Sequence, residues 1–311
     1  MELIDIPNIL EGRVLVDTNV LQCRTNKGAV IDIGEILGAE NYSDLKYFDL
    51  EGVIESLDSF LRFLGTGKDR EMTYIIPEVK TEWKNLYESI KGKKRRFNRK
   101  KPYVTNSNRE IKENLDAIIS RLQKLLRLSP KLFYKVSSGK DYSILVRIFK
   151  AISNYCPKKK GTKRRYERKS KLKNTQKPTS LYTDEKLIAL AFYISLFDKE
   201  RIGILTRDTD FIALIRRSFY LLCADDTENN EFFIKGLNDN PVSVYLLGAS
   251  RTPQGKRERL IKIVSTSDLE RSERFSIKGV GEEENENQKR YIEDLLKEAQ
   301  RNLNYDHTHI A

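Results

Sequence analysis

The sequence predicts an α/β protein in which helices flank a central parallel sheet. Short apolar segments recur along the chain, and longer segments with a helical spacing of apolar residues lie between them. This alternation is typical of units in which a helix connects two parallel strands. Apolar residues make up 39% of the 311 residues, which is enough for the core of one large domain or of two.

Short apolar runs are predicted as strands of this sheet. They lie at residues 13–16, 72–76, 202–206, 219–223 and 242–247, with some strand character also at 260–264. The runs at 13–16 and 202–206 are almost wholly apolar, as expected for strands that are buried on both faces.

Helices are predicted where apolar residues recur every three or four positions. These segments are 43–64, 108–128 and 141–155, together with two helices that begin near Pro77 and Thr183. Proline is tolerated in the first turn of a helix, and threonine is a good N-cap. The segment Gly65–Gly67 is expected to end the first of these helices. A polar helix is expected over 282–303.

The few cysteines and histidines exclude several chemistries. Three widely spaced cysteines favour neither a disulfide framework nor a cysteine zinc site, so a cytoplasmic location is expected. Both histidines, His307 and His309, lie in the last five residues, which argues against histidine catalysis in the core. No signal peptide is expected, and the longest apolar run, at 187–197, has only 11 residues, too few to span a membrane.

Positive charge is concentrated in two basic arms. The net charge is +12, with eight Lys or Arg at residues 91–101 and ten at residues 157–173. The arms predict binding to a polyanion such as nucleic acid, and a solvated, flexible loop is the alternative for each. Phe97 and Tyr103 are candidates to stack on bases. The residues predicted to bind nucleic acid are Lys93, Lys94, Arg95, Arg96, Arg99, Lys158, Lys159, Lys160, Lys163, Arg164, Arg165 and Arg168.

Acidic residues follow two of the predicted strands. Asp17 comes directly after the strand at 13–16, and Asp208 and Asp210 come after the strand at 202–206. Carboxylates crowded at strand ends repel one another unless a cation lies between them. The carboxyl edge of an α/β sheet is also where such folds bind ligands. A plain surface turn is the alternative for Asp208 and Asp210.

Two further acids lie on predicted helices. Glu82 is on the helix that begins at Pro77, and Asp184 is in the first turn of the helix that begins near Thr183. A solvated helix surface is the alternative for Glu82, and helix capping is the alternative for Asp184. Oxygen-only ligands of this kind select a hard cation, Mg²⁺ or Mn²⁺.

The order and spacing of these segments resemble the PIN-domain family of ribonucleases. The matching segments are Val14–Leu21, Ile76-Pro77 leading to Glu82, Asp184–Ala191 and Leu205–Phe211. The resemblance covers roughly residues 13–90 and 181–247, and it implies a PIN-like parallel sheet flanked by helices. It also implies that Asp17, Glu82, Asp184 and Asp208 bind Mg²⁺ or Mn²⁺, that Asp210 supports the site or a second ion, and that Asn19 and Thr206 support it by hydrogen bonds.

The resemblance implies a metal-dependent endoribonuclease that leaves a 5′-phosphate and a 3′-hydroxyl. Its substrate is expected to be single-stranded or structured RNA. A structure-specific DNA nuclease and a non-catalytic PIN-like RNA-binding or scaffold protein are the alternatives. A haloacid-dehalogenase-type phosphatase is disfavoured, because Asn19 stands where that chemistry needs a second aspartate. RNA maturation, a toxin and a defence effector all stay open as roles, as do a homodimer and a regulatory protein partner.

Three regions are predicted along the chain. Residues 1–90 and 181–250 form a discontinuous PIN-like nuclease core. Residues 91–180 form an inserted helical segment with the two basic arms, and this long insertion departs from compact members of the family. Residues 251–311 form a C-terminal extension that ends in the polar helix.

Overall fold

The structure is a computed structural model, and its chain divides into two compact units. It describes residues 12–21, 23–24, 30–31, 33–99, 106–155, 182–208, 210–222, 228–252, 255–269 and 294. The first unit comprises residues 1–135, 201–209 and 243–264, and the second comprises 136–200, 210–242 and 265–311. The predicted division into a nuclease core, an insertion and an extension stays a prediction.

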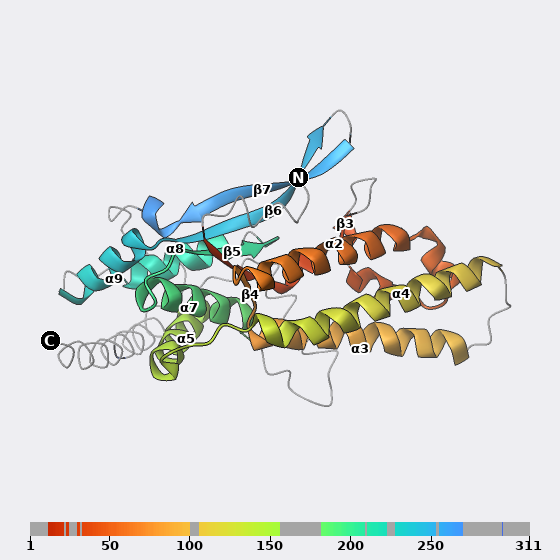
Figure 1. Ribbon diagram of the computed structural model, residues 1–311, viewed down its shortest axis with the longest axis horizontal. Helices are drawn as coiled ribbons and strands as arrows, with labels where there is room; N and C mark the ends of the chain where they lie inside the picture. The colour runs from red at the N-terminus through yellow and green to blue at the C-terminus, as the bar shows by residue number, and fades with distance from the viewer. Residues whose placement is uncertain are drawn as a thin grey trace. The chain divides into compact units, whose positions relative to one another are not determined.

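The first unit is built on a five-stranded sheet with the strand order β4-β1-β5-β6-β7 (Figure 1). Its strands are β1 Arg13–Val16, β4 Thr73–Tyr74, β5 Ile202–Thr206, β6 Val242–Thr252 and β7 Gly255–Ser265. Strand β1 pairs in parallel with both β4 and β5. Strands β6 and β7 are neighbours joined by only two residues, a connection that permits only an antiparallel hairpin. The predicted α/β class is confirmed, but the sheet is mixed and not wholly parallel.

The register of β1 against β5 decides which side chains meet at the carboxyl edge of the sheet. Leu15 pairs with Ile204, and Val16 pairs with Leu205. The ladder continues one residue further, since the Asp17 amide donates to the Leu205 carbonyl at 3.0 Å. Every residue of β5 is buried, as predicted from its uninterrupted apolar run. Asp17 and Thr206 are therefore neighbours at the ends of two central strands.

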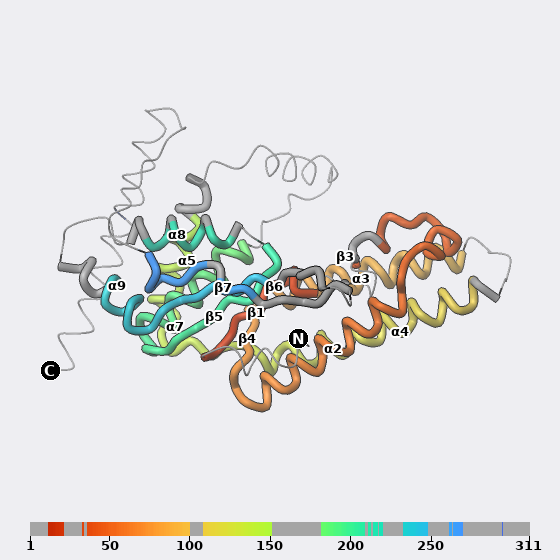
Figure 2. Tube along the Cα trace, turned by 90° about the horizontal axis from the view of Figure 1, so that it is seen from above, coloured from red at the N-terminus to blue at the C-terminus, as the bar shows by residue number. Residues whose placement is uncertain are grey.

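Three long helices complete the first unit: α2 Leu50–Asp69, α3 Pro77–Arg99 and α4 Asn106–Leu128. Helix α4 packs against both α2 and α3, and Figures 1 and 2 show the three side by side. Trp83 is fully buried between them, with its ring edge-on to Phe60 at 5.8 Å. The smaller elements are the 3-10 turns η2 Thr18–Leu21, η3 Ile33–Gly38, η4 Ser43–Tyr47 and η5 Ser129–Leu132, and the paired strands β2 Cys23–Arg24 and β3 Val30–Ile31.

The bounds of α2 differ from those predicted. The helix begins only at Leu50, because the Asp49 carboxylate caps it by accepting from the Gly52 amide at 2.9 Å. It does not end at Gly65–Gly67 but continues to Asp69. The glycine at 67 instead allows close packing, since a Cβ there would lie 1.9 Å from the Thr73 Oγ1 of β4. Gly67 is therefore a contact residue between helix and strand.

Gly67→Ala is expected to destabilise the first unit by about 3 kcal/mol, because Thr73 must shift to accommodate the new methyl group. Gly65→Ala is the matched control in the same helix. A Cβ at Gly65 meets nothing within 4 Å, so alanine is expected to stabilise the helix by about 1 kcal/mol. Urea unfolding of both variants measures the difference. Equal effects of the same sign at both positions would contradict the packing role of Gly67.

The second unit is helical in its described residues. Its elements are α5 Gly139–Tyr155, α7 Thr183–Leu196, α8 Asp210–Leu222, α9 Glu228–Asp239 and the 3-10 turn η6 Thr266–Asp268. Helix α7 is buried on all sides from Leu187 to Leu196, and it packs against α5, α8 and α9. A helix that is apolar all round belongs in the centre of its domain. The buried Ser195 of α7 is satisfied by donating from its Oγ to the Asn240 carbonyl at 2.5 Å.

Several predicted elements are confirmed, while the strand at 219–223 and the N-cap role of Thr183 are wrong. The helices at 108–128 and 141–155 are present, β6 covers 242–247, and β7 covers 260–264. Residues 219–222 of the strand predicted over 219–223 belong instead to α8, where Phe211, Ile215 and Phe219 are buried at a spacing of four, and Cys223 lies outside the described residues. Thr183 is the first residue of α7, and the N-cap position is taken by Tyr182, whose φ is 50°.

Some predicted segments lie outside the described residues. They are the second basic arm at 157–173, with its seven predicted nucleic-acid-binding residues from Lys158 to Arg168, Tyr103, and the polar helix at 282–303 apart from Asp294. No helix in the described ranges combines the length and the apolar character needed to cross a membrane.

Candidate active site

The candidate site lies at the carboxyl edge of β1 and β5 in the first unit. Asp17 follows β1 and is only 3% exposed, and Thr206 ends β5 and is fully buried. Asn19 lies two residues after Asp17, in the turn η2. A short 3-10 turn directly after the strand keeps residues 17–19 at the sheet edge. The fold thus gathers polar side chains at the place where a parallel sheet offers a binding site.

Hydrogen bonds tie residues 17–19 to residues 206–208. The Thr206 Oγ1 donates its one proton either to Asp17 Oδ2, at 2.8 Å, or to Asn19 Oδ1, at 3.2 Å. The same Thr206 oxygen accepts from the Asp208 amide at 3.0 Å. Asn19 Oδ1 also accepts from the Arg207 amide at 2.8 Å. The predicted supporting residues, Thr206 and Asn19, therefore lie in one network with Asp17 and with the backbone of Asp208.

Burial dominates the electrostatics of Asp17. The pKa of its carboxyl group is raised from 3.8 to about 7, chiefly because burial removes it from water. Hydrogen bonds from Thr206 and from the Thr18 amide, the latter at 2.6 Å, lower this pKa, while the charges of Glu82 and Asp208 raise it. Glu82 and Asp208 are thus each close enough to Asp17 to repel its charge. Positive charge placed among them would relieve the repulsion and favour the ionised form of Asp17.

Glu82 reaches this region from the second turn of α3. The helix starts at Pro77, directly after the short strand β4, and β4 pairs with β1. The Glu82 side chain is half-buried, whereas its neighbour Trp83 is fully buried. Because Trp83 must face the core, it fixes the rotation of α3 about its own axis. That rotation sets the direction in which the neighbouring Glu82 projects.

The other two predicted acids belong to the second unit. Asp184 is exposed in the first turn of α7, while the next residue, Glu185, is only 8% exposed. Asp210 is the first residue of α8, and its side chain lies outside the described atoms. The roles of Asp184 and Asp210 stay predictions from the sequence.

A complete set of metal ligands is not gathered in the described part of the chain. No three Asp, Glu, His or Cys side chains there stand together closely enough to hold a metal ion. Glu82 and Asp208 therefore act on Asp17 through their charges, but the three carboxylates do not stand close enough together to form a metal site by themselves. Their oxygen-only chemistry still fits Mg²⁺ or Mn²⁺, which keep several waters and take few protein ligands.

Most of the first basic arm is helical. This differs from the flexible loop that was one of the two predictions for it. Helix α3 continues to Arg99, because Lys and Arg favour helices and because Ile90 and Phe97 are buried. Phe97 is only 2% exposed and packs on Tyr42 with ring centres 5.1 Å apart. The prediction that Phe97 stacks on bases is therefore wrong.

Two of the predicted nucleic-acid-binding lysines make contacts within the protein. The Lys93 Nζ donates to the Ala39 carbonyl at 2.7 Å, and Lys94 forms a salt bridge with Asp116 of α4. Burial and the nearby Lys112 lower the pKa of Lys94. Arg95, Arg96 and Arg99 are exposed. The arm thus contains lysines that stabilise the fold and arginines that face solvent.

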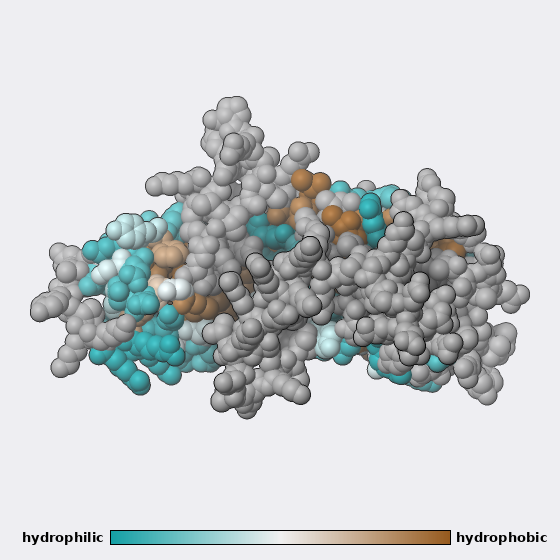
Figure 3. Space-filling view, turned by 180° about the vertical axis from the view of Figure 1, so that it is seen from behind, coloured by the Kyte–Doolittle hydropathy of each residue, from teal (hydrophilic) through white to brown (hydrophobic). Residues whose placement is uncertain are grey.

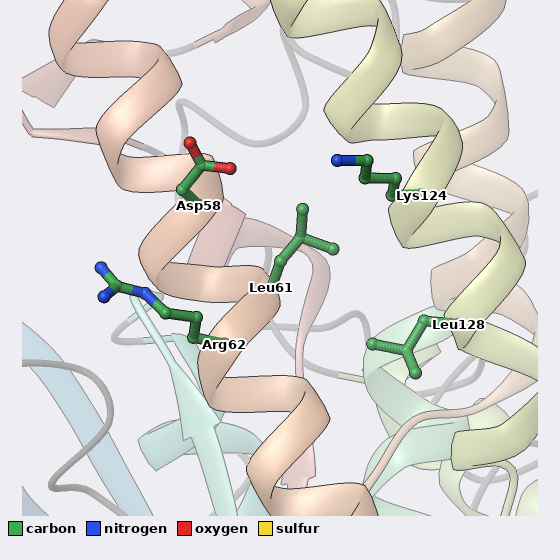
Figure 4. Close-up of a pocket in the computed structure, with 5 residues that line it drawn as sticks. All are labelled: Asp58, Leu61, Arg62, Lys124 and Leu128. Carbon is green, nitrogen blue, oxygen red and sulfur yellow. The ribbon is translucent and has the colours of Figure 1, made fainter.

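A groove between α2 and α4 lies apart from these acids (Figure 4). It is lined by Asp58, Leu61, Arg62, Lys124 and Leu128, and in Figure 4 the Arg62 side chain points away from α4. Asp58 accepts from Arg121 of α4 at 2.7 Å in a two-pronged ion pair. This pair joins the two helices, so we assign the groove a structural role.

Sequence reasoning missed two features of the first unit. Arg207 is anchored beside the acids, since its Nη1 donates to the Leu247 carbonyl of β6 at 3.2 Å. Tyr47, which ends η4, is 93% exposed. In the helix predicted over 43–64, Tyr47 does not belong to the series of apolar residues at helical spacing. This was a signal in the sequence that the Tyr47 side chain is exposed.

Comparisons with known proteins find no matching protein family, curated protein or solved structure. Function is therefore inferred from the chemistry of the site.

Proposed function

We propose that the protein is a metal-dependent endoribonuclease of the PIN-domain type. One observation carries the proposal: the buried Asp17 directly follows β1, an interior strand of the sheet, with Glu82 and Asp208 near enough to raise its pKa. Burying a carboxylate beside two others opposes folding, so a functional reason is expected for it. The PIN-like pattern of the sequence supplies that reason, because it assigns all three acids to a metal site.

Asp17, Glu82 and Asp208 are the groups of the first unit that would hold the ion. A Mg²⁺ or Mn²⁺ ion bound there would activate water for attack on a phosphodiester and would stabilise the charge that builds on the phosphate. Thr206 and Asn19 hold the Asp17 carboxylate and the 206–208 backbone in place by hydrogen bonds. The resemblance also assigns Asp184 and Asp210 to the site, and their part in it rests on the sequence alone.

Cleavage of labelled RNA in Mn²⁺, with EDTA as the negative control, tests the proposal. Asp208→Asn is expected to reduce cleavage by more than about a hundredfold, because the amide is a poor ligand for a hard cation. RNA binding measured in EDTA should be nearly unchanged. Asp69→Asn is the matched control, since Asp69 is an exposed acid at the end of α2 in the same unit. Cleavage by Asp208→Asn at the wild-type rate would refute the metal site. Cleavage of DNA in preference to RNA would reassign the substrate.

A non-catalytic RNA-binding protein with the same fold is the second candidate. The observation that favours it is that no three ligand side chains are gathered among the described residues. This candidate predicts RNA binding by the wild-type protein with no cleavage in either Mg²⁺ or Mn²⁺.

A further inference from the structure

We propose that the end of the β6–β7 hairpin binds the phosphate backbone of RNA beside the acidic edge of the sheet. We call this end the basic ribbon, and it consists of residues 249–252 of β6 and 255–259 of β7. The inference deepens the proposed function by naming a part of the first unit that holds the RNA chain. It rests on that function in treating the bound RNA as the substrate of the acids.

Strand β6 runs parallel to β5, its neighbour in the sheet. The Tyr245 ring lies against Gly203, where an added Cβ would be 2.9 Å from the ring. The Arg207 guanidinium also donates to the Leu247 carbonyl at 3.2 Å. If the strands were antiparallel, Leu247 would lie about six residues, or roughly 20 Å, from Arg207, which is too far for its side chain. Helices α8 and α9 lie between the two strands in the chain, as a parallel connection requires.

The hairpin extends past the carboxyl edge of the sheet. Strand β5 ends at Thr206, which this register places roughly level with Gly248, whereas β6 continues to Thr252 and β7 begins at Gly255. In the described strand order, the ribbon residues of β6 thus have only β7 beside them (Figure 1). The ribbon extends about 13 Å beyond the edge, on the side where Asp17 lies, and starts roughly 10 Å from the end of β1.

Positive charge is concentrated in this ribbon. It contains four basic residues and one acid, namely Arg251, Lys256, Arg257, Arg259 and Glu258. A pocket of carboxylates repels a polyanion, so basic residues beside it supply the attraction that brings a substrate close. Arginine can also bind two phosphate oxygens at once, which suits a phosphodiester backbone.

Strand β7 passes from the core into solvent as it approaches the ribbon. Val264 and Ser265 are buried, whereas Ile261 and Lys262 are exposed. Because neighbouring residues of a strand face opposite ways, both faces of β7 are open at Ile261 and Lys262. The coloured part of Figure 3 shows hydrophobic residues only in small groups, and in the described ranges Ile261 and Tyr47 are the large hydrophobic side chains that are exposed. A ribbon open on both faces is accessible to a polymer.

Protection of the sheet edge is the other role that these charges could have. Strand β7 is the last strand in the order, and charged residues on edge strands prevent pairing with other chains. That role needs charge along the whole edge. Here Arg251, Lys256 and Arg257 lie beyond the acidic edge, and Arg259 is roughly level with it. The position of the charge therefore favours binding over protection.

Fluorescence anisotropy with a labelled single-stranded RNA, measured in EDTA on the full chain, tests the ribbon. The triple variant Arg251→Thr, Lys256→Thr and Arg257→Thr removes three charges and keeps residues that favour strands. It should weaken binding at least about tenfold and reduce the log–log salt slope by about 0.7 for each lost phosphate contact. In Mn²⁺ its KM should rise with kcat nearly unchanged, because the ribbon binds RNA outside the acids.

A charge-matched control distinguishes the ribbon from general positive charge. Lys124, Arg127 and Lys131 are exposed at the end of α4 and in η5, and their triple alanine variant should keep most of the affinity. Equal losses in both triple variants would overturn the proposal. So would a ribbon variant that binds RNA normally but aggregates on size-exclusion chromatography, since that result assigns the charges to edge protection.

Two further outcomes separate the ribbon from the proposed function. If the ribbon variant loses RNA binding but the wild type cleaves nothing in Mn²⁺, the ribbon stands and the proposed function falls. If the wild type cleaves RNA and the ribbon variant keeps both its affinity and its KM, the function stands and the ribbon falls. Tighter binding of duplex DNA than of single-stranded RNA would overturn the assignment to RNA, because a two-stranded ribbon also fits the major groove of DNA.

Discussion

Asp17→Asn is expected to abolish cleavage and also to stabilise the fold at about pH 8 without divalent cations. The first effect follows if the Asp17 carboxylate binds the catalytic ion. The second follows from its burial, since only 3% of the residue is exposed and Glu82 and Asp208 repel its charge. The asparagine amide is neutral and fits the network, because the Thr206 hydroxyl can accept from it and donate to Asn19.

The sign of the pH dependence follows from the raised pKa of Asp17. The unfolded chain loses this proton near pH 3.8, while the folded protein keeps it up to about pH 7. The free energy of unfolding of the wild type should therefore fall as pH rises between these values, and stay level above them. The total fall from this residue is on the order of 4 kcal/mol. The asparagine variant should lack that fall, and it should gain no stability from Mn²⁺, whereas the wild type should gain.

Urea unfolding at a series of pH values, with and without Mn²⁺, measures both effects. The informative quantity is the difference between variant and wild type, because it cancels the titration of other groups. Asp69→Asn is again the control, and its difference from wild type should be small because Asp69 is an exposed acid at the end of α2. Parallel pH profiles for Asp17→Asn and wild type would show that Asp17 is not a buried, repelled carboxylate in solution.

The sheet edge could be predicted because its signal is local. The runs 13–16 and 202–206 are apolar, and each is followed directly by the residues that form the site. Thr206 and Asp17 are 189 residues apart, yet parallel strands bring their carboxyl ends together. The prediction failed where a short apolar run has no clear period, as in the strand predicted over 219–223, of which residues 219–222 belong to helix α8.

Other features depend on contacts between distant segments. Gly67 lies within α2 where β4 approaches too closely for a Cβ, and Phe97 is buried where Tyr42 packs on it. Neither partner can be read from the residues next to it in sequence. In the first turn of α7, Asp184 is exposed and Glu185 is buried, because successive residues of a helix point in different directions. The rotation of α7 about its axis decides which of the two acids faces the core, and the sequence of this turn does not give that rotation.

Thr206→Val is expected to damage the site without changing its shape. Valine has nearly the volume of threonine, but it removes the hydroxyl that donates to Asp17 and accepts from the Asp208 amide. The fully buried position should make the loss cost about 2 kcal/mol of stability. Cleavage should fall by about ten- to a hundredfold, as expected when a residue that orients a metal ligand is removed.

Thr206→Ser separates the hydroxyl from the packing. Serine keeps the hydrogen bonds and loses one methyl group, so it should lose about 1 kcal/mol of stability and keep most of the cleavage rate. The cleavage rate and the Mn²⁺ concentration for half-maximal cleavage report on the site, while urea unfolding reports on the fold. Because the Thr206 hydrogen bond lowers the pKa of Asp17, the valine variant should also need a higher pH than wild type to bind Mn²⁺. If serine and valine reduce cleavage equally, the hydroxyl does not position Asp17, and Thr206 serves only to fill the core.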